Sequence, residues 1–186
     1  MAELNLCIGM LALLCGLASM GSKAEPLNCQ IETNGMAKIR LGSNLHDVQQ
    51  RYPQAQITRS SDGDGAALVS IVLTPAIGLI AYTGEDDPAA ALDMQRPISY
   101  LETDSPACRT AAGVHPQMAL AAAEQYYGKV RQITLSEIEA RQFAEFARQP
   151  DGLHFQIDDA GIFKGNQRTS RRHQPDARIS HIGVGL

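Results

Sequence analysis

The stretch Leu45–Tyr52 (LHDVQQRY) is followed 75 residues later by Leu120–Tyr127 (LAAAEQYY), which has the same pattern of apolar positions. Each segment has an apolar or aromatic residue at its first, fourth and eighth position. Spacings of three and four residues place such side chains on one face of a helix. Each segment also ends at a helix breaker, Pro53 in the first and Gly128 in the second. We therefore predict two short amphipathic helices at matching places in a duplicated unit.

The same offset continues through segments that favour β-strands. These segments are short, contain β-branched and aromatic residues and are bounded by turn residues, which is typical of strands. The aligned pairs are Gln54–Arg59 with Lys129–Thr134, Ala66–Thr74 with Arg141–Gln149, Leu79–Tyr82 with His154–Ile157 and, after a six-residue length difference, Ile98–Leu101 with Ile179–Ile182. We predict an α+β fold of two tandem repeats, each one short helix packed on a four-stranded antiparallel sheet.

The segment Thr134–Arg148 could form a helix or a strand, because its composition favours a helix. A Pro-Asp-Gly turn follows it immediately, which is typical of a hairpin. Its repeat partner Ala66–Thr74 is also rich in β-branched residues, which favour strands. We predict a strand over about residues 141–148, with a bulge because Phe143 and Phe146 break strict alternation.

The first 24 residues resemble a secretory signal peptide. The apolar run Leu6–Met20 carries no charge, and Ser22 with Ala24 forms a small-x-small cleavage site. No Lys or Arg precedes the run, so an uncleaved anchor is the alternative; however, its 15 residues fall short of the ~20 that span a membrane. We expect cleavage near Ala24, a periplasmic or secreted location and no transmembrane segment in the mature chain.

Cleavage would leave two cysteines, Cys29 and Cys108, in an oxidising compartment. An even pair in that setting predicts one structural disulfide, and neither cysteine has further zinc ligands nearby. Each cysteine precedes its predicted helix by a similar distance, so the bridge would join the two repeats. We expect it to contribute roughly 3–5 kcal/mol by closing a loop of about 80 residues.

The repeats define the expected domain organisation. Residues 1–24 form the signal peptide, residues 25–104 the first repeat and residues 105–186 the second. A unit of about 75 residues buries too little surface to be stable alone. We therefore expect the two repeats to form one compact domain of unspecified oligomeric state.

Composition and motifs exclude several function classes. A charged fraction of 19% with 44% apolar residues argues against disorder, and a net charge of −4 argues against nucleic-acid binding. The sequence has no HExxH, CxxC or GxSxG motif, so we expect no metal, no cofactor and no catalytic residues. The alternative is a small periplasmic hydrolase that uses Asp104 and His115 as a dispersed acid–base pair.

Two loops of opposite charge are the most informative candidates for binding. The acidic loop, residues 84–97, carries four acids and one Arg, whereas the basic loop, residues 159–178, carries five bases and two acids. Three interpretations are open: the loops are solvated hairpin connections, they neutralise each other across the repeats, or they form a recognition surface. In the last case guanidinium groups favour an anionic protein, lipid or glycan of the bacterial envelope. The predicted contact residues are Lys164, Arg168, Arg171, Arg172 and His173.

Superposed, the two predicted helix starts give a composite of Gly42 from the first copy and Met118 from the second, followed by Leu, Val, Tyr and Gly. This composite resembles the G-M-(S/T)-x-x-x-V segment of the β-lactamase-inhibitor protein family and of the small outer-membrane lipoproteins of the barrel-assembly machinery. The first copy has Ser43 where the family prefers Met, and the second has Gln117 where it prefers Gly. The resemblance implies an exported, non-catalytic protein-binding module, of a kind also found among bacterial periplasmic proteins of unknown role.

Overall fold

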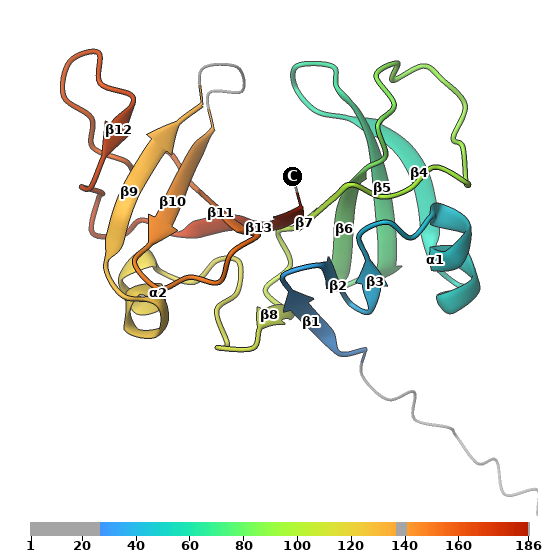
Figure 1. The fold of residues 1–186 in the computed structure, drawn as a ribbon, viewed down its shortest axis with the longest axis horizontal. Helices are drawn as coiled ribbons and strands as arrows, with labels where there is room; N and C mark the ends of the chain where they lie inside the picture. The colour runs from blue at the N-terminus through green and yellow to red at the C-terminus, as the bar shows by residue number, and fades with distance from the viewer. Residues whose placement is uncertain (1–26, 137–140, 186) are drawn as a thin grey trace, which may run out of the picture.

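The computed structural model describes residues 27–136 and 141–185, which form thirteen strands and two helices (Figure 1). The predicted signal peptide lies outside the described residues. In chain order the elements are β1 (Cys29–Glu32), β2 (Gly35–Met36), β3 (Ile39–Arg40), α1 (Leu45–Arg51), β4 (Gln56–Ser61), β5 (Ala67–Thr74), β6 (Ile77–Tyr82), β7 (Tyr100–Thr103), β8 (Cys108–Thr110), α2 (Leu120–Tyr127), β9 (Val130–Leu135), β10 (Gln142–Phe146), β11 (Leu153–Ile157), β12 (Thr169–Ser170) and β13 (Ile179–Gly185).

Nine of these strands form one continuous sheet in the order β12-β9-β10-β11-β13-β7-β6-β5-β4. The strands that follow α1 form one half of this sheet, and the strands that follow α2 form the other half. The halves meet where β7 pairs antiparallel with β13, from Thr103 opposite Ile182 to Tyr100 opposite Gly185. The last strand of each half is therefore an interior strand of the whole sheet.

The prediction of an α+β fold built from two helix-on-four-strand repeats is wrong. The described chain is mostly β, with one nine-stranded and one four-stranded sheet. Two separate sheets would each have exposed a final edge strand, and pairing of β7 with β13 removes both edges. Both sheets also cross the predicted boundary between residues 104 and 105, and the duplication itself stays a prediction.

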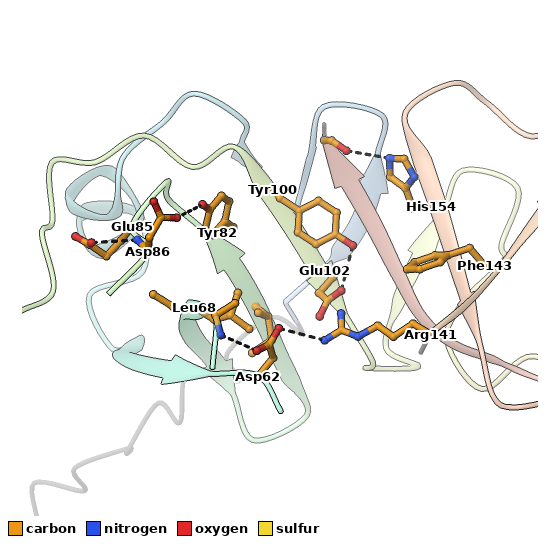
Figure 2. Close-up of a pocket in the computed structure, with 14 residues that line it drawn as sticks. Asp62, Leu68, Tyr82, Glu85, Asp86, Tyr100, Glu102, Arg141, Phe143 and His154 are labelled. Carbon is orange, nitrogen blue, oxygen red and sulfur yellow. Dashed lines mark hydrogen bonds and ion pairs between the residues drawn. The ribbon is translucent and has the colours of Figure 1, made fainter. Parts of the chain in front are cut away.

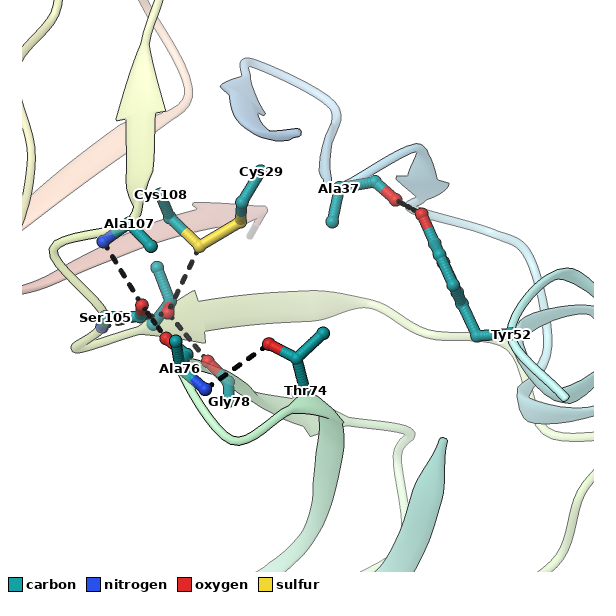
Figure 3. Close-up of a disulfide and its surroundings, with 10 residues drawn as sticks. Cys29, Ala37, Tyr52, Thr74, Ala76, Gly78, Ser105, Ala107 and Cys108 are labelled. Carbon is teal, nitrogen blue, oxygen red and sulfur yellow. Dashed lines mark hydrogen bonds between the residues drawn. A yellow bond between two sulfur atoms is a disulfide. The ribbon is translucent and has the colours of Figure 1, made fainter. Parts of the chain in front are cut away.

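The four-stranded sheet, in the order β3-β2-β1-β8, comes from the segments that precede the helices. Its strands β1 and β8 run parallel, with Cys29 directly opposite Cys108. The predicted disulfide is confirmed: the two sulfurs are bonded, and the Cα atoms lie 4.5 Å apart (Figure 3). The cysteine pair is recognisable in the sequence but the sheet is not, because its strands are only two to four residues long.

The helices and the four-stranded sheet cover one face of the nine-stranded sheet (Figure 1). Strict alternation along the strands creates that buried face; in β5, for example, Val69 and Ile71 point into the core while Leu68 and Val72 lie on the opposite face. The buried residues of both halves form one hydrophobic cluster. The opposite face of the sheet is free to carry a binding site.

Both predicted helices are confirmed, and a tyrosine at the end of each connects it to the four-stranded sheet. The Tyr52 hydroxyl donates to the Ala37 carbonyl (Figure 3), and the Tyr127 hydroxyl donates to Thr110 Oγ1 at 2.8 Å. Each tyrosine therefore connects the C-terminal end of its helix to the four-stranded sheet. Burial raises the pKa of the Tyr127 phenol, an effect that the bond with Thr110 partly offsets.

The ambiguous segment forms a strand, β10, as predicted, with an irregularity in its pairing between Glu145 and Phe146. Residues 137–140 lie outside the described part of the chain. One aligned pair is wrong by one residue, because Ile80 lies on the outer face whereas its partner Phe155 is fully buried. A shift of one residue moves every side chain of a strand to the opposite face. The shift arises because the turn between β5 and β6 is shorter than the turn between β10 and β11.

Candidate functional site

A central groove of about 410 Å³ lies on the outer face of the nine-stranded sheet, across the junction of its two halves (Figure 2). Its floor comes from β6, β7, β13 and β11, which are adjacent in the sheet. Its sides come from the ends of β5 and β10, near Asp62 on one side and Arg141 on the other. The pairing of β7 with β13 thus creates the site, which neither half has alone.

Two glycines, Gly183 and Gly185, lie in β13, which forms part of the floor of the groove. Gly183 lies beneath the Tyr100 ring, and a Cβ at Gly183 would come within 2.1 Å of the phenol oxygen. Gly185 has a φ of +104°, which few other residues adopt. Because Gly183 has no side chain, the Tyr100 ring can lie across β13.

Two tyrosine–carboxylate pairs stand side by side on β6 and β7. Tyr82 and Tyr100 are direct cross-strand neighbours. The Tyr82 hydroxyl donates to Asp86 Oδ1 at 3.0 Å, and the Tyr100 hydroxyl donates to Glu102 Oε2 at 3.1 Å (Figure 2). The bond to Asp86, followed by burial, raises the pKa of the Tyr82 phenol, so this phenol remains a donor at neutral pH.

Glu102 is the most unusual group in the groove, because it is only 7% exposed in the middle of the sheet. Among the described residues, no Lys, Arg or His nitrogen lies within 4.0 Å of its carboxylate. The Tyr100 hydroxyl bonds only Oε2, which leaves Oε1 without a described hydrogen-bond donor. A buried carboxylate with so little compensation is costly unless a ligand supplies a partner.

Apolar side chains form much of the remaining wall. Leu68 of β5, Ile80 of β6 and Phe143 of β10 all line the groove from the outer face of the sheet. At its mouth, Arg141 Nη2 lies 3.7 Å from Asp62 Oδ2 and so bridges the two halves (Figure 2). Apolar walls around a few fixed polar groups are typical of a ligand-binding site.

His154 of β11 also lines the groove, and its position is fixed on two sides. Its Nε2 lies 2.9 Å from the Gly185 carbonyl oxygen, and its ring centroid lies 6.4 Å from that of Tyr100. A contact to a carbonyl places the proton of the imidazole on Nε2, because a carbonyl only accepts. His154 is therefore held by the protein itself and is a wall of the site.

The predicted basic loop lies at one edge of the nine-stranded sheet, away from the groove. Its short strand β12 pairs with β9. Four of its five predicted contact residues are exposed, His173 is half-buried, and Arg171 Nε donates to the Arg131 carbonyl at 3.0 Å. The structure thus brings the five predicted residues onto one segment at the β9 edge, which we call the basic end: Lys164, Arg168, Arg171, Arg172 and His173.

The acidic loop runs from the groove, which Glu85 and Asp86 line, to the opposite edge of the same sheet. Arg59 of the edge strand β4 donates to the carbonyls of Ala90 and Ala91 in this loop. The loop is partly neutralised from within, because Arg96 Nη2 lies 3.2 Å from Glu85. The two loops therefore do not neutralise each other.

The alternative acid–base pair gains no support from its position. Asp104 is an exposed residue that follows β7, and His115 Nδ1 contacts the Pro116 carbonyl at 2.7 Å. Neither residue lines the groove. The described residues also contain no group of three or more His, Cys, Asp and Glu side chains that could hold a metal ion.

The groove could not be predicted from the sequence, for a physical reason. Tyr82, Tyr100 and Glu102 lie in strands whose partners determine which side chains meet, and no local spacing predicts the pairing of β7 with β13. Two signals were nevertheless present in the sequence: the acid within the strand Tyr100–Thr103 and the Gly-x-Gly pattern ending at Gly185.

Comparisons with known proteins inform the fold only. No family model and no curated protein matches the chain. The chain is similar to a crystal structure of the uncharacterized protein YfeY from Escherichia coli, with a TM-score of 0.54 and 10% identity over 84% of this chain and 99% of that chain. At this identity the similarity shows a shared fold and no function. The resemblance to the inhibitor and lipoprotein families stays a prediction.

No helix within residues 27–136 and 141–185 is both long enough and apolar enough to span a membrane.

Proposed function

We propose that this chain is a non-catalytic binding protein that holds its ligand in the central groove. The observation that carries the proposal is a groove of about 410 Å³ with apolar walls around two tyrosine–carboxylate pairs. Its volume falls within the range of small-molecule sites, roughly 300–1,000 Å³. The groove spans the junction of the two halves, so an occupant would contact both.

We further propose that the protein works in the periplasm or outside the cell. The disulfide between Cys29 and Cys108 supports this location, because structural disulfides are rare in a reducing cytosol. The predicted signal peptide points to the same compartment.

Binding of an apolar dye tests the groove. The neutral fluorophore N-phenyl-1-naphthylamine should bind saturably, and Leu68→Asp should weaken its binding about tenfold, because a charge replaces a wall of the site. Val72→Asp is the matched control: Val72 lies on the same face of β5, is 37% exposed and does not line the groove. Equal affinities for the two variants would contradict the proposal.

The basic end is a second candidate surface, for an anionic envelope protein, lipid or glycan. Its support is the gathering of exposed guanidinium groups at one sheet edge, with Arg171 held in place by Arg131. Replacing Arg171 and Arg172 with Glu should reduce capture of an envelope partner and its dependence on salt. Unchanged capture from an envelope extract would exclude this surface.

A further inference from the structure

We propose that the central groove selects a small organic cation, an ammonium group carried on an apolar body. This inference rests on the proposed function and adds the chemical class of the ligand. It follows from the charges of the groove, from its aromatic rings and from the burial and incomplete hydrogen bonding of Glu102.

The carboxylates of the groove outnumber its cations. Among the described residues, four acids line it, Asp62, Glu85, Asp86 and Glu102, against one guanidinium, that of Arg141. Asp62 is paired with Arg141, and Glu85 is paired with Arg96. The other two, Asp86 and Glu102, have a tyrosine hydroxyl as their side-chain partner and no ion pair among the described residues. The groove therefore has two carboxylates whose charge a ligand can neutralise.

Glu102 gives this excess charge a definite position. It lies between Tyr100 on its own strand and Ile80 opposite it on β6, and its side chain points into the groove (Figure 2). Its Oε1 is available, because Tyr100 bonds Oε2. An ammonium group donating to Oε1 would form a charge-assisted hydrogen bond with a carboxylate that is only 7% exposed, and partial burial strengthens such bonds.

The surrounding rings favour the same ligand. Tyr82, Tyr100 and Phe143 line the groove together with the carboxylates. The faces of aromatic rings attract cations, and this attraction increases when water is excluded. Leu68 and Ile80 then offer apolar contact to the rest of the molecule. A fully hydrated metal ion would gain nothing from these walls, whereas an alkyl or aryl ammonium uses both parts of the site.

Three probes of matched shape test the inference: 4-phenylbutylammonium, 4-phenylbutanol and 4-phenylbutanoate, which carry a positive, no and a negative charge. Calorimetric titration of the full mature protein should give the ammonium probe the highest affinity and the carboxylate probe the lowest. Equal affinities of the ammonium and alcohol probes would overturn the inference while leaving the proposed function intact. Failure of all three probes and of the neutral dye would count against both.

The variant Glu102→Gln separates charge from shape. It should lower affinity for the ammonium probe about tenfold, the value of a hydrogen bond to a charged group, and leave the alcohol probe within about twofold. Glu145→Gln is the matched control, because Glu145 lies on the same sheet face but is paired with Arg131 at 2.6 Å outside the groove. Equal loss in both variants would show a nonspecific effect of net charge and would overturn the assignment of Glu102.

Discussion

Helices α1 and α2 begin in the same way beside the ends of one sheet, but different residues stabilise them. Gly42 N donates to the Ile98 carbonyl before α1, and Gln117 N donates to the Ile179 carbonyl before α2. Both residues have a left-handed backbone conformation, with φ of +84° at Gly42 and +69° at Gln117. The backbone at the helix start is thus alike, while the side chains that support it differ.

The differences continue along the helices. Asn44 caps α1 through a reciprocal pair of hydrogen bonds with Asp47, whereas Ala119 provides no side-chain cap for α2. At the other end, Gln49 donates to backbone carbonyls, whereas Glu124 accepts from Lys129 and from the Val130 amide. The comparison shows that a shared backbone arrangement tolerates either neutral or charged support.

Exchanging the residues with a left-handed backbone, Gly42 and Gln117, should change the free energy of unfolding most. Gly42→Ala should destabilise the protein by about 1–2 kcal/mol, because a Cβ is strained in this conformation even where space is free. Gln117→Gly should instead stabilise it by about 0.5 kcal/mol, since relief of strain is partly offset by the added freedom of the unfolded chain. Urea unfolding measures both changes. Loss of stability in Gln117→Gly would contradict the account.

Exchanging the caps should have a somewhat smaller effect. Asn44→Ala should cost about 1 kcal/mol, because it leaves the Asp47 amide without its partner. Ala119→Ser should add about 0.5 kcal/mol by supplying the missing cap to α2. Thermal unfolding followed by circular dichroism measures the two shifts, which should be opposite in sign. Two shifts of the same sign would show that tertiary packing, and not capping, controls these helices.

The smallest expected effect is the contribution of Glu124 to the pH dependence of stability. Burial raises the pKa of Glu124, but the hydrogen bonds from Lys129 and the Val130 amide outweigh it and leave the pKa below its ordinary value. A lowered folded-state pKa stabilises the protein above the unfolded pKa, and this contribution disappears as pH falls through the folded-state pKa.

The variant pair Glu124→Gln and Gln49→Ala tests this directly. Glu124→Gln should reduce stability to urea at neutral pH but not in acid. The loss of stability caused by Gln49→Ala should be the same at every pH. Urea midpoints of the variants and the wild type, measured across acidic pH, give the comparison. A pH-independent loss in Glu124→Gln would show that its charge has no role.

Local features were predictable from the sequence, whereas the assembly of the sheet was not. The apolar spacing of Leu45, Val48 and Tyr52 predicted α1, and the pair Cys29 and Cys108 predicted the disulfide, because these signals depend on neighbours or on simple chemistry. The pairing of β7 with β13 is between residues about 80 positions apart and has no local signature.

The candidate site was missed for the same reason. The basic loop drew attention because its charges are close together in sequence, whereas Asp86, Glu102 and Phe143 meet only through the sheet. Two local signals were present, the acid Glu102 within a short strand and the pair of glycines at 183 and 185. The burial of Glu102 and its contact with Tyr100 required the structure.

The most direct test of the central claim is a backbone NMR titration of the mature protein with 4-phenylbutylammonium. The account predicts chemical-shift changes that centre on Tyr82, Tyr100 and Glu102 and extend to Gly185, where the two halves of the sheet meet. Shifts confined to the basic end, or no shifts where the alcohol probe produces them, would contradict it.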